Sequence, residues 1–166
     1  MMKGTPMKRC LYFGLLLIVC LSLAACDLKV DFNLKHIEDT NGADDHSLTT
    51  ITKEQLLGNS GAVKLLSARY QVNDKIEYSV DKFTGVEKVE EVRVKDGTDS
   101  ITFAVNTTLT EGNMYVYVRH DGQIVGELAI GKDDVLTIEK PTPGKYELCI
   151  AGESAKFKMV IQITQN

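Results

Sequence analysis

The chain has 166 residues, of which 23 are acidic and 19 are basic, so its formal net charge at neutral pH is −4. An acidic balance argues against nucleic acid as a partner, because binding to phosphates requires clustered lysine and arginine. The chain contains no tryptophan. This removes the usual aromatic platform for sugars, although tyrosine can substitute for it.

The first 25 residues have the composition of a secretory signal peptide. Lys3, Lys8 and Arg9 give the start of the chain a positive charge, and residues 11–25 follow as an uncharged run. A membrane-spanning helix needs about 20 apolar residues, so this run is too short to cross a bilayer. A charged start, a short apolar middle and a small-residue end predict a signal peptide over residues 1–25. Three methionines are candidates for the start of translation: Met1, Met2 and Met7.

The end of this run, Leu23-Ala24-Ala25-Cys26, resembles the lipobox of bacterial lipoproteins. In proteins with this motif the cysteine thiol receives a diacylglyceryl group, and a peptidase then cuts before it. The resemblance implies that Cys26 is the lipid attachment site and the new N-terminus. Asp27 resembles the inner-membrane retention signal of enteric-type Gram-negative bacteria and would have no such role in a Gram-positive cell. The alternative is an ordinary signal peptide cleaved near Ala25.

A diacylglyceryl group on Cys26 implies a membrane as partner and the extracytoplasmic face of the bacterial cell membrane as location. Two acyl chains hold a protein stably where one binds only marginally. Three of the 19 basic residues and none of the 23 acidic ones precede Cys26, so the remainder has 16 basic residues, 23 acidic ones and a net charge of −7. That charge disfavours docking on anionic lipid, so the acyl chains must hold the protein.

The chain divides into three parts: the signal peptide at 1–25, a lipidated N-terminal segment at 26–61 and a β-sandwich domain at 62–166. After cleavage before Cys26, the length suits one domain with its own core. Cys149 would then be the one thiol left, so no disulfide could form within the molecule. A buried structural thiol is the favoured interpretation, and a reactive thiol or a disulfide between molecules is the alternative.

The segment 26–61 begins with an alternation of apolar and polar residues over residues 28–34. A period of two predicts a half-buried strand or an extended tether with strand potential. A polar, acidic stretch follows over residues 38–46. Its favoured interpretation is a solvated linker that keeps the domain clear of the membrane.

The same stretch holds the residues that could bind a metal: His36, Asp39, Asp44, Asp45 and His46. The spacing of a calcium-binding EF-hand loop fails, because placing Gly42 at position 6 puts Ile37 and Leu48 where carboxylates are required. Two histidines with acidic residues leave zinc as an alternative. We expect no metal and no cofactor.

A short helix is predicted after this linker. Thr52 and Gln55 fit a capping box, in which the threonine caps the helix and the glutamine reaches back. Gly58 ends the helix after one or two turns.

From residue 62 the pattern is that of successive strands. Runs with strand character cover residues 63–72, 75–80, 86–95, 101–105, 114–120, 123–130, 135–139, 146–150 and 157–164. The turns between them contain Asn73-Asp74, Asp96-Gly97, Asp121-Gly122, Pro141-Thr142-Pro143-Gly144 and, for a closing hairpin, Gly152-Glu153-Ser154. We expect about seven or eight of these nine runs to form short strands, and this spacing predicts an all-β fold, an antiparallel sandwich.

The end of the chain carries a second resemblance. GKYELCIAG followed by AKFKMVIQI is similar to the last strands of immunoglobulin-like and pre-peptidase C-terminal-type β-sandwiches. The resemblance implies an immunoglobulin-like sandwich and says little about function.

The hairpin around Asp121-Gly122 has apolar residues on both faces. With a two-residue turn, Tyr117 lies opposite Gly126 and covers it. One face would carry Tyr115, Tyr117, Ile124 and Leu128, and the other Met114, Val116, Val118 and Val125. We therefore expect the opposite sheet to cover one face, and the N-terminal segment or a partner to cover the other.

No catalytic constellation is found in the sequence. His120 has no serine or cysteine near it in sequence, and no nucleophile-elbow motif is present. We expect the strand that carries Glu87, Glu90 and Glu91 to face solvent. Spacing alone therefore does not identify two carboxylates as the catalytic pair of a glycosidase.

One row of side chains could recognise a partner. Tyr115, Tyr117 and Arg119 are of the types favoured at interfaces. Cross-strand packing is the favoured alternative.

These observations predict a non-catalytic binding module on the outer face of a membrane, for a protein, an envelope polymer or a small ligand. The alternative is an assembly role in which the edge of the sandwich pairs with another envelope protein. An enzyme is the third hypothesis.

Overall fold

The computed structural model describes residues 48–58 and 61–166, all within one compact unit that spans Ala43–Asn166. The elements in chain order are α1 (Lys53–Leu57), β1 (Ala62–Val72), β2 (Lys75–Val94), β3 (Ser100–His120), β4 (Gln123–Leu128), β5 (Asp133–Glu139) and β6 (Gly144–Gln165). The predicted signal peptide, Cys26, the predicted strand at 28–34 and the acidic linker lie outside the described residues.

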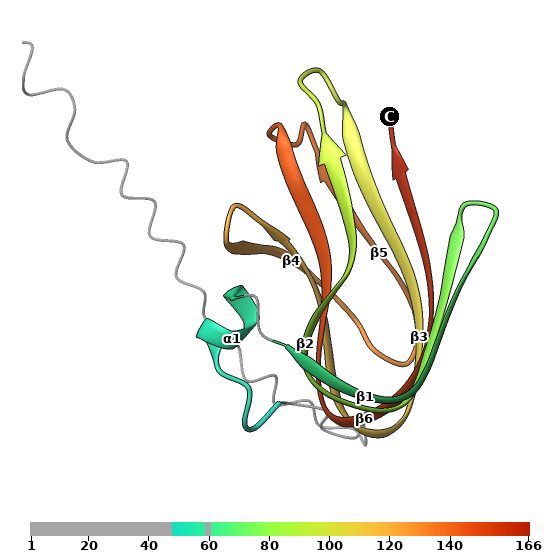
Figure 1. Ribbon diagram of the computed structural model, residues 1–166. Coiled ribbons are helices and arrows are strands. Elements are labelled where there is room, and N and C mark those ends of the chain that lie inside the picture. The colour runs from blue at the N-terminus through green and yellow to red at the C-terminus, as the bar shows by residue number, and fades with distance from the viewer. Residues whose placement is uncertain (1–47, 59–60) are drawn as a thin grey trace, which may run out of the picture. The chain divides into compact units, whose positions relative to one another are not determined.

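The six strands form one antiparallel sheet that is folded over on itself (Figure 1). Its order is β1-β2-β6-β3-β4, and β5 pairs with the first half of β3. The strands β2, β3 and β6 have 20, 21 and 22 residues, and each bends once and continues. The all-β, sandwich-like fold predicted from the sequence is therefore confirmed.

The bends divide the sheet into two layers. The β1 layer contains β1, β5, the first halves of β2 and β3 and the second half of β6. The β4 layer contains β4, the second halves of β2 and β3 and the first half of β6. Irregularities in the strand register mark the bends, near Phe83 in β2 and near Gly112 in β3. Gly112 has φ +73, and a Cβ there would lie 2.5 Å from the carbonyl oxygen of Glu153.

The prediction of many short strands is wrong. The residues at each bend have the composition of a turn, so each long strand was predicted as two short ones. The expected pairs of short strands at 75–80 and 86–95, 101–105 and 114–120, and 146–150 and 157–164 are β2, β3 and β6. The predicted closing hairpin over Gly152-Glu153-Ser154 does not form. Glycine and polar residues at these points allow a bulge, and a bulge bends a strand without ending it.

The core fills the space between the layers. It contains side chains from both, among them Phe83, Phe103 and Phe157 of the β1 layer and Val116 and Leu148 of the β4 layer. The ring of Phe157 meets the ring of Phe83 edge to face, with centroids 5.9 Å apart. Burial of such side chains provides the main stabilisation of a fold that has no disulfide within its described part.

The helix α1 forms as predicted. The Thr52 hydroxyl accepts from the backbone N–H of Gln55, and the Gln55 side chain accepts from the backbone N–H of Thr52 at 2.8 Å. Gly58 is the C-cap. No helix in the described part of the chain is long and apolar enough to span a membrane.

The β3–β4 hairpin turns at Asp121-Gly122 as predicted, but its register is not the predicted one. A bulge after Val118 leaves Val125 unpaired, so Tyr117 lies opposite Glu127, and Gly126 lies opposite Val118. The prediction that Tyr117 covers Gly126 is therefore wrong.

Leu136 of β5 covers Gly126 instead. A Cβ at Gly126 would lie 2.4 Å from a methyl carbon of Leu136. The bulge also reverses the alternation beyond it, so Leu128 joins the core between the layers rather than the outer face with Tyr115 and Tyr117.

Candidate functional site

The row Tyr115, Tyr117 and Arg119 lies on the outer face of the β4 layer, where the segment 48–58 covers it. Tyr117 is fully buried, and Arg119 is 6% exposed. Of the two covers expected for this face, the N-terminal segment or a partner, the structure shows the first, because Leu48, Ile51 and Leu56 pack against a small second core there. Its buried members are Val86, Tyr117, Cys149 and Ala151. The row therefore binds a part of its own chain.

Arg119 holds the C-terminal end of α1. One guanidinium nitrogen donates to the carbonyl oxygens of Leu57 at 2.6 Å and Gly58 at 2.8 Å. The other nitrogens donate to the carboxylate of Glu147, at 2.7 and 2.8 Å. A cation at this position satisfies carbonyl groups that have no partner within the helix.

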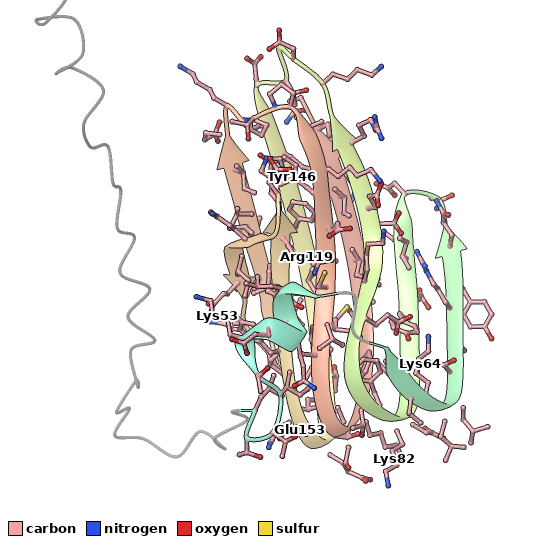
Figure 2. The ribbon with its side chains drawn as sticks, turned by 60° about the vertical axis from the view of Figure 1, so that its left-hand side comes forward. Lys53, Lys64, Lys82, Arg119, Tyr146 and Glu153 are labelled. Carbon is pink, nitrogen blue, oxygen red and sulfur yellow. The ribbon has the colours of Figure 1, made fainter. Side chains whose placement is uncertain are left out.

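Glu153 holds the other end of the segment (Figure 2). Its carboxylate accepts from the backbone N–H groups of Thr49, Thr50 and Ile51 and from both threonine hydroxyls. Partial burial would raise the pKa of Glu153, but these hydrogen bonds favour the ionised form and lower it to about 2. The segment 48–58 is thus fixed at both ends by a charged side chain.

Cys149 lies beneath this segment and is 1% exposed. Burial raises the pKa of its thiol to about 11. The predicted burial of this thiol is confirmed.

The carboxylates predicted to face solvent are half-buried and paired. Glu87 and Glu90 point inward from β2 and meet Lys64 and Arg69 of β1, so these ion pairs close one open side of the sandwich. The bulge near Glu90 turns this part of β2 inward, which the alternation of the sequence does not show. Glu91 lies outward between two lysines, and its hydrogen bonds with Lys88 and then Lys145 lower its pKa to about 2. The solvent-facing assignment is therefore wrong for Glu87 and Glu90.

His120 has a hydroxyl partner that the sequence did not reveal. The fold brings Thr142 to 2.9 Å from its Nε2 atom, and the carbonyl oxygen of Lys145 lies 3.0 Å from Nδ1. A carbonyl oxygen only accepts, so Nδ1 carries a proton and donates to Lys145, while Nε2 shares a hydrogen bond with the Thr142 hydroxyl. The ring also stacks on Tyr146 with centroids 4.1 Å apart. The two nitrogens of His120 thus tie the end of β3 to the start of β6 and to the connection that precedes it.

Five of the eight large apolar residues that are exposed in the described chain lie on β1, which is an edge strand. We name them the β1 surface, and with their exposed fractions they are Val63 77%, Leu65 58%, Leu66 74%, Tyr70 63% and Val72 54%. The strand pairs with β2 on one side and has no partner strand on the other within the described residues.

The β1 surface follows from an unusual distribution of residue types on β1. Tyr70 pairs with Glu77 and Val72 pairs with Lys75, both on the outward side of β2. The inward positions of β1 carry Lys64 and Arg69 instead, in the ion pairs described above. The strand therefore presents its apolar side away from the core.

The outer face of the β1 layer continues from Tyr70 with two shallow grooves. One is lined by Tyr70, Glu77, Ser79, Lys158 and Val160, among others. The second lies across Val160 and is lined by side chains of β2, β3, β5 and β6. No helix covers this face in the described residues, in contrast to the outer face of the β4 layer.

The residues considered for a metal site at 36–46 lie outside the described residues. Within residues 48–58 and 61–166, no group of three or more histidine, cysteine, aspartate or glutamate side chains could hold a metal ion.

Comparison of the sequence with protein-family models finds no match, and comparison with curated proteins finds none either.

Proposed function

We propose that this protein is a lipid-anchored, non-catalytic binding module on the outer face of a bacterial membrane, and that it binds a protein through β1. The anchor is the lipidated Cys26 implied by the lipobox. The binding site is the free edge of β1 together with the β1 surface.

The single observation that carries this proposal is the exposure of the β1 surface. Five large apolar side chains on one strand are each more than half exposed. Scattered apolar residues are normal on a protein surface, but a contiguous group marks an interaction site. Natural edge strands are usually short or carry charges that block pairing. On β1 both charged residues are tied to glutamates of the same chain.

A partner strand added to β1 would satisfy its unpaired backbone groups and place its own side chains beside the outward apolar residues of β1. In strand addition, main-chain hydrogen bonds provide affinity and alternate side chains provide specificity. Specificity here would come from Tyr70 and Val72 on the outward side. The net charge of −7 after Cys26 favours a protein over nucleic acid as the partner.

Photo-crosslinking in intact cells tests this function. We would replace Tyr70 by benzoylphenylalanine in the full chain and irradiate cells that express it. The matched control places the same group at Val125, an exposed apolar residue on β4 at the opposite edge of the sheet. The proposal expects discrete protein adducts at position 70 and none at position 125.

A second substitution sharpens the result. Leu65→Lys places a charge within the β1 surface and should remove the adducts at position 70, while Val125→Lys should leave them in place. Absence of adducts at position 70, or equal adducts at both positions, would refute strand addition at β1.

A polymer ligand is the second candidate, favoured by the two shallow grooves beside Val160. Their lining combines an exposed tyrosine with charged and polar side chains, which suits a chain with hydroxyl groups. Co-sedimentation of the protein with insoluble cell-envelope polymer, compared between wild type and Lys158→Glu, tests this candidate. Equal sedimentation of both proteins would count against it.

A further inference from the structure

We infer that the partner strand is β1 of a second copy, so that two molecules pair antiparallel about Tyr70. This inference rests on the proposed function and names its partner. It depends on the register of β1, its charges and the anchor.

The regular part of β1 that can pair is residues 67–72. Leu66 has φ 49 and interrupts the regular strand, and Asn73 has φ 57 in the turn that follows. Between them, Ala68, Tyr70 and Val72 lie outward, opposite Ser79, Glu77 and Lys75 of β2. The intervening residues Ser67, Arg69 and Gln71 lie inward, opposite core residues of β2.

Directly opposed residues in an antiparallel pair lie on the same face of the sheet. Two copies of residues 67–72 can therefore pair only in registers that place outward residues opposite outward ones. The register centred on Tyr70 fulfils this condition. It places Tyr70 opposite Tyr70 of the second copy and Ala68 opposite Val72, so every outward pair is apolar or aromatic. A twofold axis through Tyr70 then relates the two molecules, as in most protein dimers.

The charges of β1 do not oppose this register. Arg69 would lie opposite Gln71 of the second copy, so no like charges face each other across the new pair. The guanidinium of Arg69 is already paired with Glu90 of its own chain. The net negative charge of each copy acts over longer distances, where salt at about 0.15 M screens charges beyond about 8 Å.

The proposed anchor favours a second copy over a soluble partner. Lipid on Cys26 would confine all copies to one plane, which raises the effective concentration of each β1 for another. A small interface is then sufficient for pairing, as the short length of residues 67–72 requires.

Disulfide trapping in the cell envelope tests the register. A disulfide needs Cα atoms within about 7 Å of each other. In the proposed register two cysteines at position 70 face each other, so Tyr70→Cys is expected to give a reducible dimer on a non-reducing gel. Position 68 of one molecule faces position 72 of the other. The two positions 68 are therefore four residues apart along the strand, which is about 13 Å at about 3.3 Å per residue.

Ala68→Cys and Val72→Cys should therefore each remain largely monomeric alone. Co-expressed with two different epitope tags, they should form a mixed dimer, and this pair retains Tyr70. Val125→Cys on β4 is the control for random collision, and Cys149 is too buried to interfere.

The outcomes separate this inference from the function on which it rests. A dimer at position 70 together with a mixed 68–72 dimer supports the second copy. Equal dimers from all variants, including Val125→Cys, would indicate collision and overturn it. Absence of these dimers with photo-adducts of another protein at position 70 overturns the second copy and leaves strand addition intact. Absence of both dimers and adducts refutes both.

Discussion

At the scale of single residues, the buried hydroxyl of Thr107 lowers the stability of the fold. Thr107 lies on β3 and is 1% exposed, and its hydroxyl has no hydrogen-bond partner among the described residues. A buried hydroxyl without a partner costs free energy, because it has given up its hydrogen bonds to water.

Thr107→Val is therefore expected to stabilise the fold by about 1 kcal/mol, since it replaces the hydroxyl by a methyl group of similar size. Thermal or urea unfolding of the two proteins measures the difference. Thr110→Val is the matched control, because the Thr110 hydroxyl donates to the carbonyl oxygen of Lys156 at 3.0 Å. That variant should be less stable than wild type. Destabilisation by Thr107→Val of the same size as by Thr110→Val would show that the Thr107 hydroxyl has a partner.

At the scale of an element, the position of the segment 48–58 depends more on hydrogen bonds to the Glu153 carboxylate than on the intrinsic stability of α1. The helix α1 has five residues and buries none of them. Short helices are marginal in water, so contacts with the sheet must hold this one in place. Glu153 provides hydrogen bonds to the residues that precede it.

Glu153→Gln should lower the free energy of unfolding at neutral pH by about 1–3 kcal/mol, because hydrogen bonds to a charged group are replaced by weaker ones. The folded-state pKa of Glu153 lies near 2, below its ordinary value of 4.5. Its contribution is thus complete above the ordinary pKa and is lost as pH falls toward 2.

The difference in melting temperature between wild type and Glu153→Gln should accordingly be constant from pH 7 to about pH 5 and should shrink below pH 4.5. Glu139→Gln, at an exposed position of β5, is the control and should show no such difference. A difference that persists unchanged at pH 2.5 would mean that the carboxylate does not act through its charge.

The elements that sequence patterns predicted correctly are those with local causes. The capping box of Thr52 and Gln55 and the turn at Asp121-Gly122 each depend on a few adjacent residues, and both form. The long strands were not predictable in the same way. Gly152-Glu153-Ser154 has the composition of a turn, and only pairing with two other strands keeps this stretch within β6.

The candidate site was predictable in part for the same reason. Residues 63–72 have a clear strand pattern, but their apolar side would ordinarily be assigned to the core. The fact that it lies outward depends on Lys64 and Arg69 meeting Glu87 and Glu90, which are distant in sequence. Similarly, Tyr117 and Arg119 have the residue types of an interface, but they bind α1 of their own chain.

At the scale of the whole molecule, the proposed anchor would determine where the β1 surface operates. Replacement of Cys26 by alanine should abolish labelling of the protein by palmitate in growing cells, because the thiol is the proposed attachment atom. Cys149→Ala is the matched control and should be labelled like wild type, since that thiol is buried. Equal labelling of Cys26→Ala and wild type would refute the anchor and, with it, the proposed location.

The position of β6 has a consequence for how the protein would reach the proposed location. The last strand of the chain lies in the centre of the sheet, between β2 and β3, which do not pair with each other. A ribosome or a translocation channel releases β6 after the other five described strands, so neither layer can be completed until β6 has emerged. Premature folding on the wrong side of the membrane would block export through a narrow channel. In this topology the strand order itself would delay folding until β6 had passed through the channel.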